Sequence, residues 1–108
     1  MNLRVKRCPV ADDEHAESRR QYAHVFHRAN TICVADAFYS LPETHSIAIL
    51  LHEVGHRLSG RNAREASADR AIENVAGIKV RRRNSRFGER LEWIRLRDKP
   101  RAKEFLGL

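Results

Sequence analysis

The stretch LLHEVGHRLSG, residues 50–60, decides how this chain is interpreted. It follows the apolar residues 47–51, yet it places His52, Glu53 and His56 where a packed helix would keep apolar side chains. Burying a polar group without a partner costs roughly 2–7 kcal/mol, depending on the reference state. The stretch therefore needs a partner or ligand that compensates for this cost.

Helix geometry indicates that the ligand is a metal ion. His52 and His56 are four residues apart, so on a helix their imidazoles share one face and can bind one ion. Glu53 lies about 100° around the helix, where it can reach a water bound to that ion. This is the H-E-x-x-H pattern of zinc hydrolases. Gly55 lacks a side chain, which allows close packing against the site or against a substrate strand.

A catalytic zinc usually has three protein ligands and one open position. The metzincin pattern fails, because Ser59 and Asn62 stand where it requires glycine and histidine. The next candidates are Glu65 and Asp69, four residues apart on a second predicted helix. We expect Glu65 to be the third ligand and Asp69 to orient a ligand histidine. The reverse assignment stays open, and so does a capping role for Glu65, three residues after an Asn62 N-cap.

The residues before this stretch predict two strands and a helix. Alternation over residues 2–10 predicts an edge-type strand, and residues 12–28 predict a helix with acidic residues first. Residues 30–41 are rich in β-branched and aromatic side chains, which predicts a strand broken near Ala35 and Asp36.

Two helices and a hairpin are expected afterwards. A capping box at residues 40–43 begins the helix that ends at Gly60, and residues 62–76 form the next helix, ending at Gly77. Residues 78–97 alternate around a turn at 84–88, which predicts a hairpin with Leu91 and Trp93 on its apolar side. Residues 102–106 predict a short terminal helix.

HEVGH followed by EASAD resembles the gluzincin-type zinc metallopeptidases, including the ImmA/IrrE-like and M48-type peptidases. The short chain looks most like the minimal, single-domain minigluzincins. The resemblance in motif covers about residues 50–72. It implies an α+β zincin-like domain: a short, mostly antiparallel sheet packed on a backing helix, an H-E-x-x-H active-site helix and a glutamate helix. It also implies one Zn²⁺ held by His52, His56 and Glu65, with Asp69 as partner of a ligand histidine. Only eight residues separate His56 from Glu65, fewer than in many relatives.

The activity implied is that of a zinc metalloendopeptidase. A zinc-bound water attacks the peptide carbonyl, and Glu53 acts as general base before it delivers the proton to the leaving amine. The thiolate of Cys8 would hold a latent form if it took the open zinc position, although a small residue packed on a strand is the more ordinary role. The alternative function is a nucleic-acid-associated or regulatory protein-interaction module, with a structural or vestigial zinc site.

Composition limits the other classes. The 108 residues are expected to form one domain, residues 1–108, and no apolar run is long enough to span a membrane. Two cysteines do not make a disulfide framework, which favours the cytoplasm. Residues 1–78 hold ten basic and ten acidic side chains, whereas residues 79–108 hold eleven and four, so the whole excess charge of +7 lies in the last third. That asymmetry indicates an anionic partner, or a solvated basic face.

Overall fold

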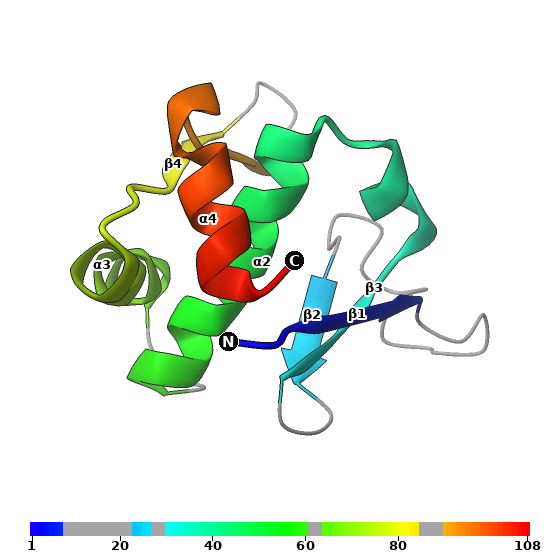
Figure 1. Cartoon of the computed structure of the whole chain (residues 1–108), viewed down its shortest axis with the longest axis horizontal. Helices are drawn as coiled ribbons and strands as arrows, with labels where there is room; N and C mark the ends of the chain where they lie inside the picture. The colour runs from blue at the N-terminus through cyan, green and yellow to red at the C-terminus, as the bar shows by residue number, and fades with distance from the viewer. Residues whose placement is uncertain (8–22, 27–29, 61–63, 85–89) are drawn as a thin grey trace.

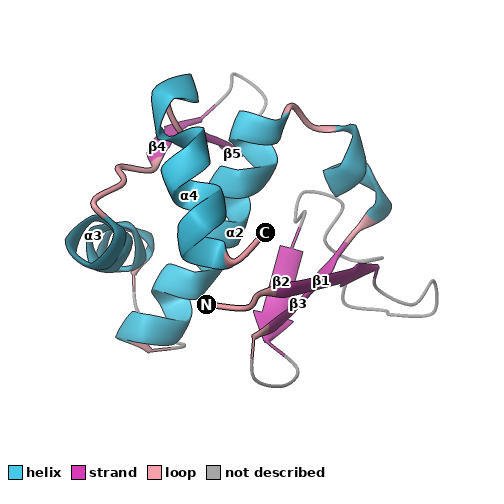
Figure 2. Cartoon of the chain, viewed as in Figure 1, coloured by secondary structure: helices cyan, strands magenta, loops and turns pink. Residues whose placement is uncertain are grey.

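The computed structural model describes residues 1–7, 23–26, 30–60, 64–84 and 90–108. Its centre is the helix α2 (Glu43–Ser59), which contacts α3 (Glu65–Ala76), α4 (Lys99–Leu106), β2 (Ala23–Phe26) and β5 (Arg90–Trp93). Figures 1 and 2 show α3 and α4 on one side of α2 and a small sheet on the other. The α+β class expected from the sequence is confirmed. No helix in the described ranges has the length and apolar character that crossing a membrane requires.

Within the described ranges the sheet has three strands in the order β1-β3-β2, with β1 at Arg4–Arg7 and β3 at Thr31–Val34. β3 runs parallel to β1 and antiparallel to β2, so this sheet is mixed rather than mostly antiparallel. Ile32, Cys33 and Val34 are each at most 1% exposed, as in a central strand covered on both faces. The predicted break is also present, because the 3₁₀ helix η1 (Asp36–Ser40) follows β3 after one residue.

The helix predicted over residues 12–28 is wrong at its C-terminal end. Residues 23–26 form β2, which pairs with β3. Val25 and Phe26 are residue types that strands favour, and the pairing with β3 outweighs their helical spacing. Residues 12–22 of that prediction lie outside the described residues, so the expected backing helix stays a prediction.

The start of α2 differs from the predicted capping box. Pro42 occupies the N-cap position without a side-chain hydrogen bond, while Ser40 is the last residue of η1. Proline already restricts the backbone at the helix entry, and the Ser46 hydroxyl donates to the Glu43 carbonyl at 3.1 Å. The helix ends at Gly60, whose φ of 105° favours glycine, as predicted.

The predicted hairpin is confirmed and consists of β4 (Arg81–Asn84) and β5. The prediction that Leu91 and Trp93 form its apolar side is wrong, because the opposite side of β5 faces the core. Glu92 and Ile94 are buried, whereas Leu91 and Trp93 are only half-buried. Glu92 is directly opposite Arg82 in the antiparallel pair, and their ion pair allows a charged residue on the inner side. The turn at residues 85–89 lies outside the described residues.

The terminal helix α4 is present and begins earlier than predicted, at Lys99. Its Lys99 ammonium lies 2.7 Å from the Glu43 carboxylate at the start of α2, and Lys103 pairs with the same carboxylate. The backbone N–H of Leu3 donates to the Leu106 carbonyl at 2.9 Å, so both ends of the chain meet beside α2 (Figure 1).

Candidate metal centre

The position of the site follows from a close contact between α2 and α3. Gly55 is buried, and a Cβ atom placed on it would overlap the carbonyl oxygen of Ala68 and lie 2.8 Å from its carbonyl carbon. Any larger residue would hold the two helices apart. The glycine of the motif therefore lets the N-terminal half of α3 approach the histidines of α2.

Three predicted ligands meet at this contact. Oε2 of Glu65 lies 2.5 Å from Nε2 of His52, and Oε1 lies 3.3 Å from Nε2 of His56. The two Nε2 atoms are 3.0 Å apart. Among the described residues these three side chains form a group whose ligand atoms all lie within 4.8 Å of one another. Glu65 is the first residue of α3, with Arg64 at the N-cap, so its carboxylate is not at the predicted N3 capping position.

The donor set fits zinc. Zinc–nitrogen and zinc–oxygen bonds are about 2.0–2.2 Å long, which puts two tetrahedral ligands about 3.4 Å apart. The three contacts of 2.5, 3.0 and 3.3 Å are at or just below that spacing, so the side chains need to separate by less than about 1 Å to admit an ion. Two imidazoles and a carboxylate are also the ligand types of a catalytic zinc with one open position.

Asp69 lies on the other side of the His52 ring. Its Oδ1 is 2.8 Å from Nδ1 of His52, and because a carboxylate accepts, this contact favours the tautomer with its proton on Nδ1. The lone pair of Nε2, the nitrogen beside Glu65 and His56, is then available to a metal ion. Burial alone would lower the pKa of His52, but the hydrogen bond to Asp69 and the nearby charges of Glu92 and Glu65 outweigh it, so the pKa is raised. The two acids of α3 thus lie at different nitrogens of the His52 ring, Glu65 at Nε2 and Asp69 at Nδ1.

The sequence missed Arg82, which completes the contacts around Asp69. Its Nη2 lies 2.9 Å from Oδ2 of Asp69 and 3.3 Å from Oε1 of Glu92. The same nitrogen is 2.9 Å from Nδ1 of His52, but Nδ1 carries a proton when it donates to Asp69, so the carboxylates accept from the guanidinium. Arg82 belongs to a run of three arginines, residues 81–83, within which nothing in the sequence distinguishes it. The signal that identifies it is its place opposite Glu92 across the hairpin.

The charges joined by these contacts do not cancel. With both imidazoles neutral, Glu65, Asp69 and Glu92 contribute −3 and Arg82 contributes +1, a sum of −2. Their side chains are between 8% and 39% exposed, so water screens them incompletely. With the imidazoles neutral, as metal ligands are, a divalent cation would bring this sum to zero.

The other residues singled out in the sequence lie outside the group of ligand atoms, or outside the described residues. Glu53 is half-buried on α2 and does not belong to the group of ligand atoms within 4.8 Å. Nδ1 of His56 is buried and has no hydrogen-bond partner in the described ranges of the chain. Cys8 lies outside the described residues, whereas Cys33 is a free, buried thiol of the core.

Comparisons of this chain with protein-family models, with curated proteins and with solved structures find no match. The geometry of the site therefore carries the functional argument.

Proposed function

We propose that this protein is a zinc-dependent metallopeptidase of the gluzincin type. The observation that carries the proposal is the position of Glu65, a residue of a second helix whose carboxylate contacts Nε2 of both motif histidines. An H-E-x-x-H sequence predicts two of the ligands by itself. A third ligand from α3, together with a carboxylate on His52 Nδ1, is what distinguishes a metal site from two neighbouring histidines.

The roles of the residues follow from their chemistry. His52, His56 and Glu65 would hold the ion, which when bound supplies a Lewis acid for the peptide carbonyl and for water. Glu53 would accept a proton from the attacking water at a carboxylate oxygen and deliver it to the leaving amine. Asp69 would keep the proton of His52 on Nδ1, so that Nε2 stays a ligand.

Metal content is the first test. We expect about one zinc per wild-type chain by elemental analysis, lost in His56→Ala and Glu65→Ala and retained at reduced affinity in Asp69→Ala. Chains that bind no zinc, even after zinc is supplied without chelator, would refute the proposal. If Asp69→Ala loses zinc and Glu65→Ala retains it, Asp69 is the third ligand and Glu65 is not.

Peptide cleavage then separates a peptidase from a protein with a structural zinc. Glu53→Gln removes the base without removing a ligand, so we expect full zinc content and no cleavage of a quenched fluorescent peptide library. If neither wild type nor Glu53→Gln cleaves, the zinc is structural and the alternative of a regulatory or nucleic-acid-associated module gains support. Equal cleavage by the two proteins would show that Glu53 is not the general base.

A further inference from the structure

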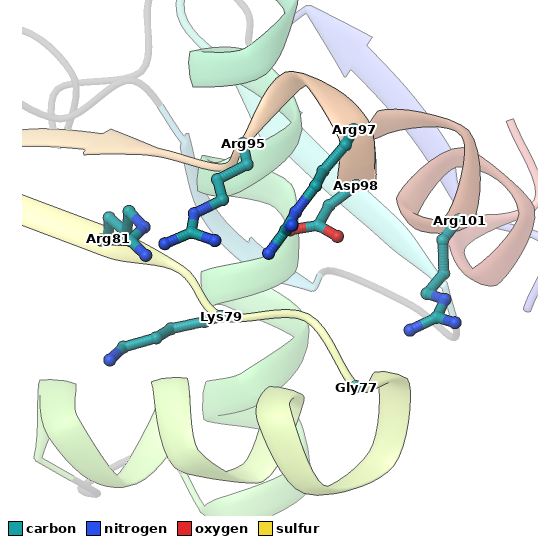
Figure 3. A pocket seen from close by; sticks show the side chains of 7 residues that line it. All are labelled: Gly77, Lys79, Arg81, Arg95, Arg97, Asp98 and Arg101. Atoms are coloured by element: carbon teal, nitrogen blue, oxygen red, sulfur yellow. The ribbon is translucent and has the colours of Figure 1, made fainter.

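A second site lies on the other face of β4. A cavity of about 590 Å³ opens between the end of α3, the strand β4 and the segment that joins β5 to α4. Figure 3 shows that its walls are dominated by basic side chains, and these are Lys79, Arg81, Arg95, Arg97 and Arg101. One carboxylate, that of Asp98, stands among them. The cavity has the volume of an ordinary small-ligand site.

Strand geometry separates this cavity from the metal centre. Successive side chains point to opposite faces of a strand, and here Val80 and Arg82 face the protein interior. Lys79 and Arg81, the residues before and between them, therefore point the other way and line the cavity. Arg95 follows the buried Ile94 in the same manner.

The described part of the chain supplies no ion-pair partner to the five cavity cations. None of the five forms an ion pair or side-chain hydrogen bond with another residue of the described ranges. The guanidinium of Arg101 instead lies over Gly77, where an added Cβ would meet its Nη1 at 3.3 Å. A hollow of 590 Å³ is about 10 Å across, close to the Debye length of about 8 Å at physiological salt, so one anion at its centre would interact with all five charges.

We propose that this cavity binds a compact polyphosphate group, such as the di- or triphosphate part of a small molecule. Four of the five cations are arginines, whose planar guanidinium groups match phosphate oxygens in pairs. All five cations line one hollow of limited volume, which favours clustered phosphates over an extended nucleic-acid backbone. No aromatic side chain of the described residues lines the cavity, so a nucleic-acid base has no ring there on which to stack.

Calorimetric titration of the purified chain with tripolyphosphate, at about 0.15 M salt, tests this site. We expect saturable binding with one equivalent per chain. The double variant Arg95→Gln/Arg97→Gln changes two exposed residues and should weaken binding at least tenfold. The matched control Arg4→Gln/Arg70→Gln removes the same charge from exposed positions outside the cavity and should change the affinity less than threefold.

Two further titrations distinguish the cavity from the metal centre and from a nucleic-acid surface. His56→Ala loses a metal ligand, so unchanged binding by this variant shows that tripolyphosphate is not captured by the metal centre. This also separates the cavity from the proposed peptidase function, because either can fail without the other. An eight-nucleotide single-stranded DNA, compared at equal phosphate concentration, should bind more weakly than tripolyphosphate.

Three results would overturn the inference. One is the absence of saturable tripolyphosphate binding to wild type. Another is an equal loss of tripolyphosphate affinity in the cavity variant and the control, which would show that only the net charge of the protein matters. The third is tighter binding of the DNA with similar losses in both variants, which would indicate an extended nucleic-acid surface.

Discussion

The contact between Gly55 and Ala68 predicts the consequence of adding one methyl group. In Gly55→Ala the new Cβ would lie 2.8 Å from the Ala68 carbonyl carbon, whereas carbon atoms pack at about 3.5 Å or more. The helix α3 must therefore move by at least about 0.7 Å, since the obstacle is backbone and cannot rotate away. Asp69 moves with α3, so the shift would lengthen its 2.8 Å contact with Nδ1 of His52, the contact that orients this ring. Zinc affinity should therefore fall at least tenfold, or about 1.4 kcal/mol.

The same substitution changes stability through two opposing terms. Alanine in a helix interior is favoured over glycine by about 0.5–1 kcal/mol, whereas overpacking a close contact costs about 1–3 kcal/mol. We expect a net loss of about 1 kcal/mol in the free energy of unfolding, or roughly 4–8 °C in Tm. Ser67→Ala is the control, because it replaces an exposed residue of α3 and raises helix propensity without adding a contact to α2.

Chelator competition for zinc and thermal unfolding by circular dichroism measure both effects. The reasoning is refuted if Gly55→Ala binds zinc within threefold of wild type and unfolds at the temperature of Ser67→Ala or above. Loss of zinc affinity with unchanged stability would show that α3 moves at little cost, and it would still locate the site at the contact of the two helices.

Three more perturbations test the surrounding contacts. Asp69→Asn should lower zinc affinity about 10–100-fold in the same competition assay while stoichiometry stays at one. Arg82→Met leaves the buried Glu92 without its guanidinium and should cost about 3–5 kcal/mol in denaturant unfolding, whereas Arg82→Met/Glu92→Met should recover most of that loss. Hydrogen bonds from Lys103 and Lys99 lower the pKa of Glu43 from its ordinary value of 4.5. Ionised Glu43 therefore stabilises the folded state at pH values above 4.5. Glu43→Gln should unfold more easily than wild type at neutral pH, and the difference should vanish as the pH falls through the lowered pKa.

The parts of the fold that depend on local pattern were predictable. The helix through His52 and His56, its end at Gly60 and the hairpin after Gly77 all follow from spacing and from turn residues. These signals lie within a few positions of one another in the sequence. Because the H-E-x-x-H spacing is itself a helical spacing, the amino-acid sequence alone predicts that both histidines lie on one face of the helix.

The parts of the fold that depend on tertiary contacts could not be predicted from local pattern. Residues 23–26 carry both a helical stripe and strand-forming side chains, and only their pairing with β3 decides between the two. The inner side of β5 was misassigned because Glu92 occupies a core position, which a rule based on hydrophobicity assigns to the surface. The opposite side was therefore given to the core, and Arg82 across the hairpin was overlooked with it.

The charge balance explains why these polar groups are tolerated in the interior. One arginine beside three carboxylates leaves an excess of −2, and replacing Arg82 with an apolar residue would make it −3. A second arginine at the position of His56 would neutralise more charge, but a guanidinium has no lone pair to offer a metal ion. This choice of residue agrees with the proposed metal site, because an imidazole can bind a dication and an arginine cannot. Arg81, adjacent in sequence to Arg82, lines the cavity instead, so a single strand, β4, separates an excess of negative charge on one face from an excess of positive charge on the other.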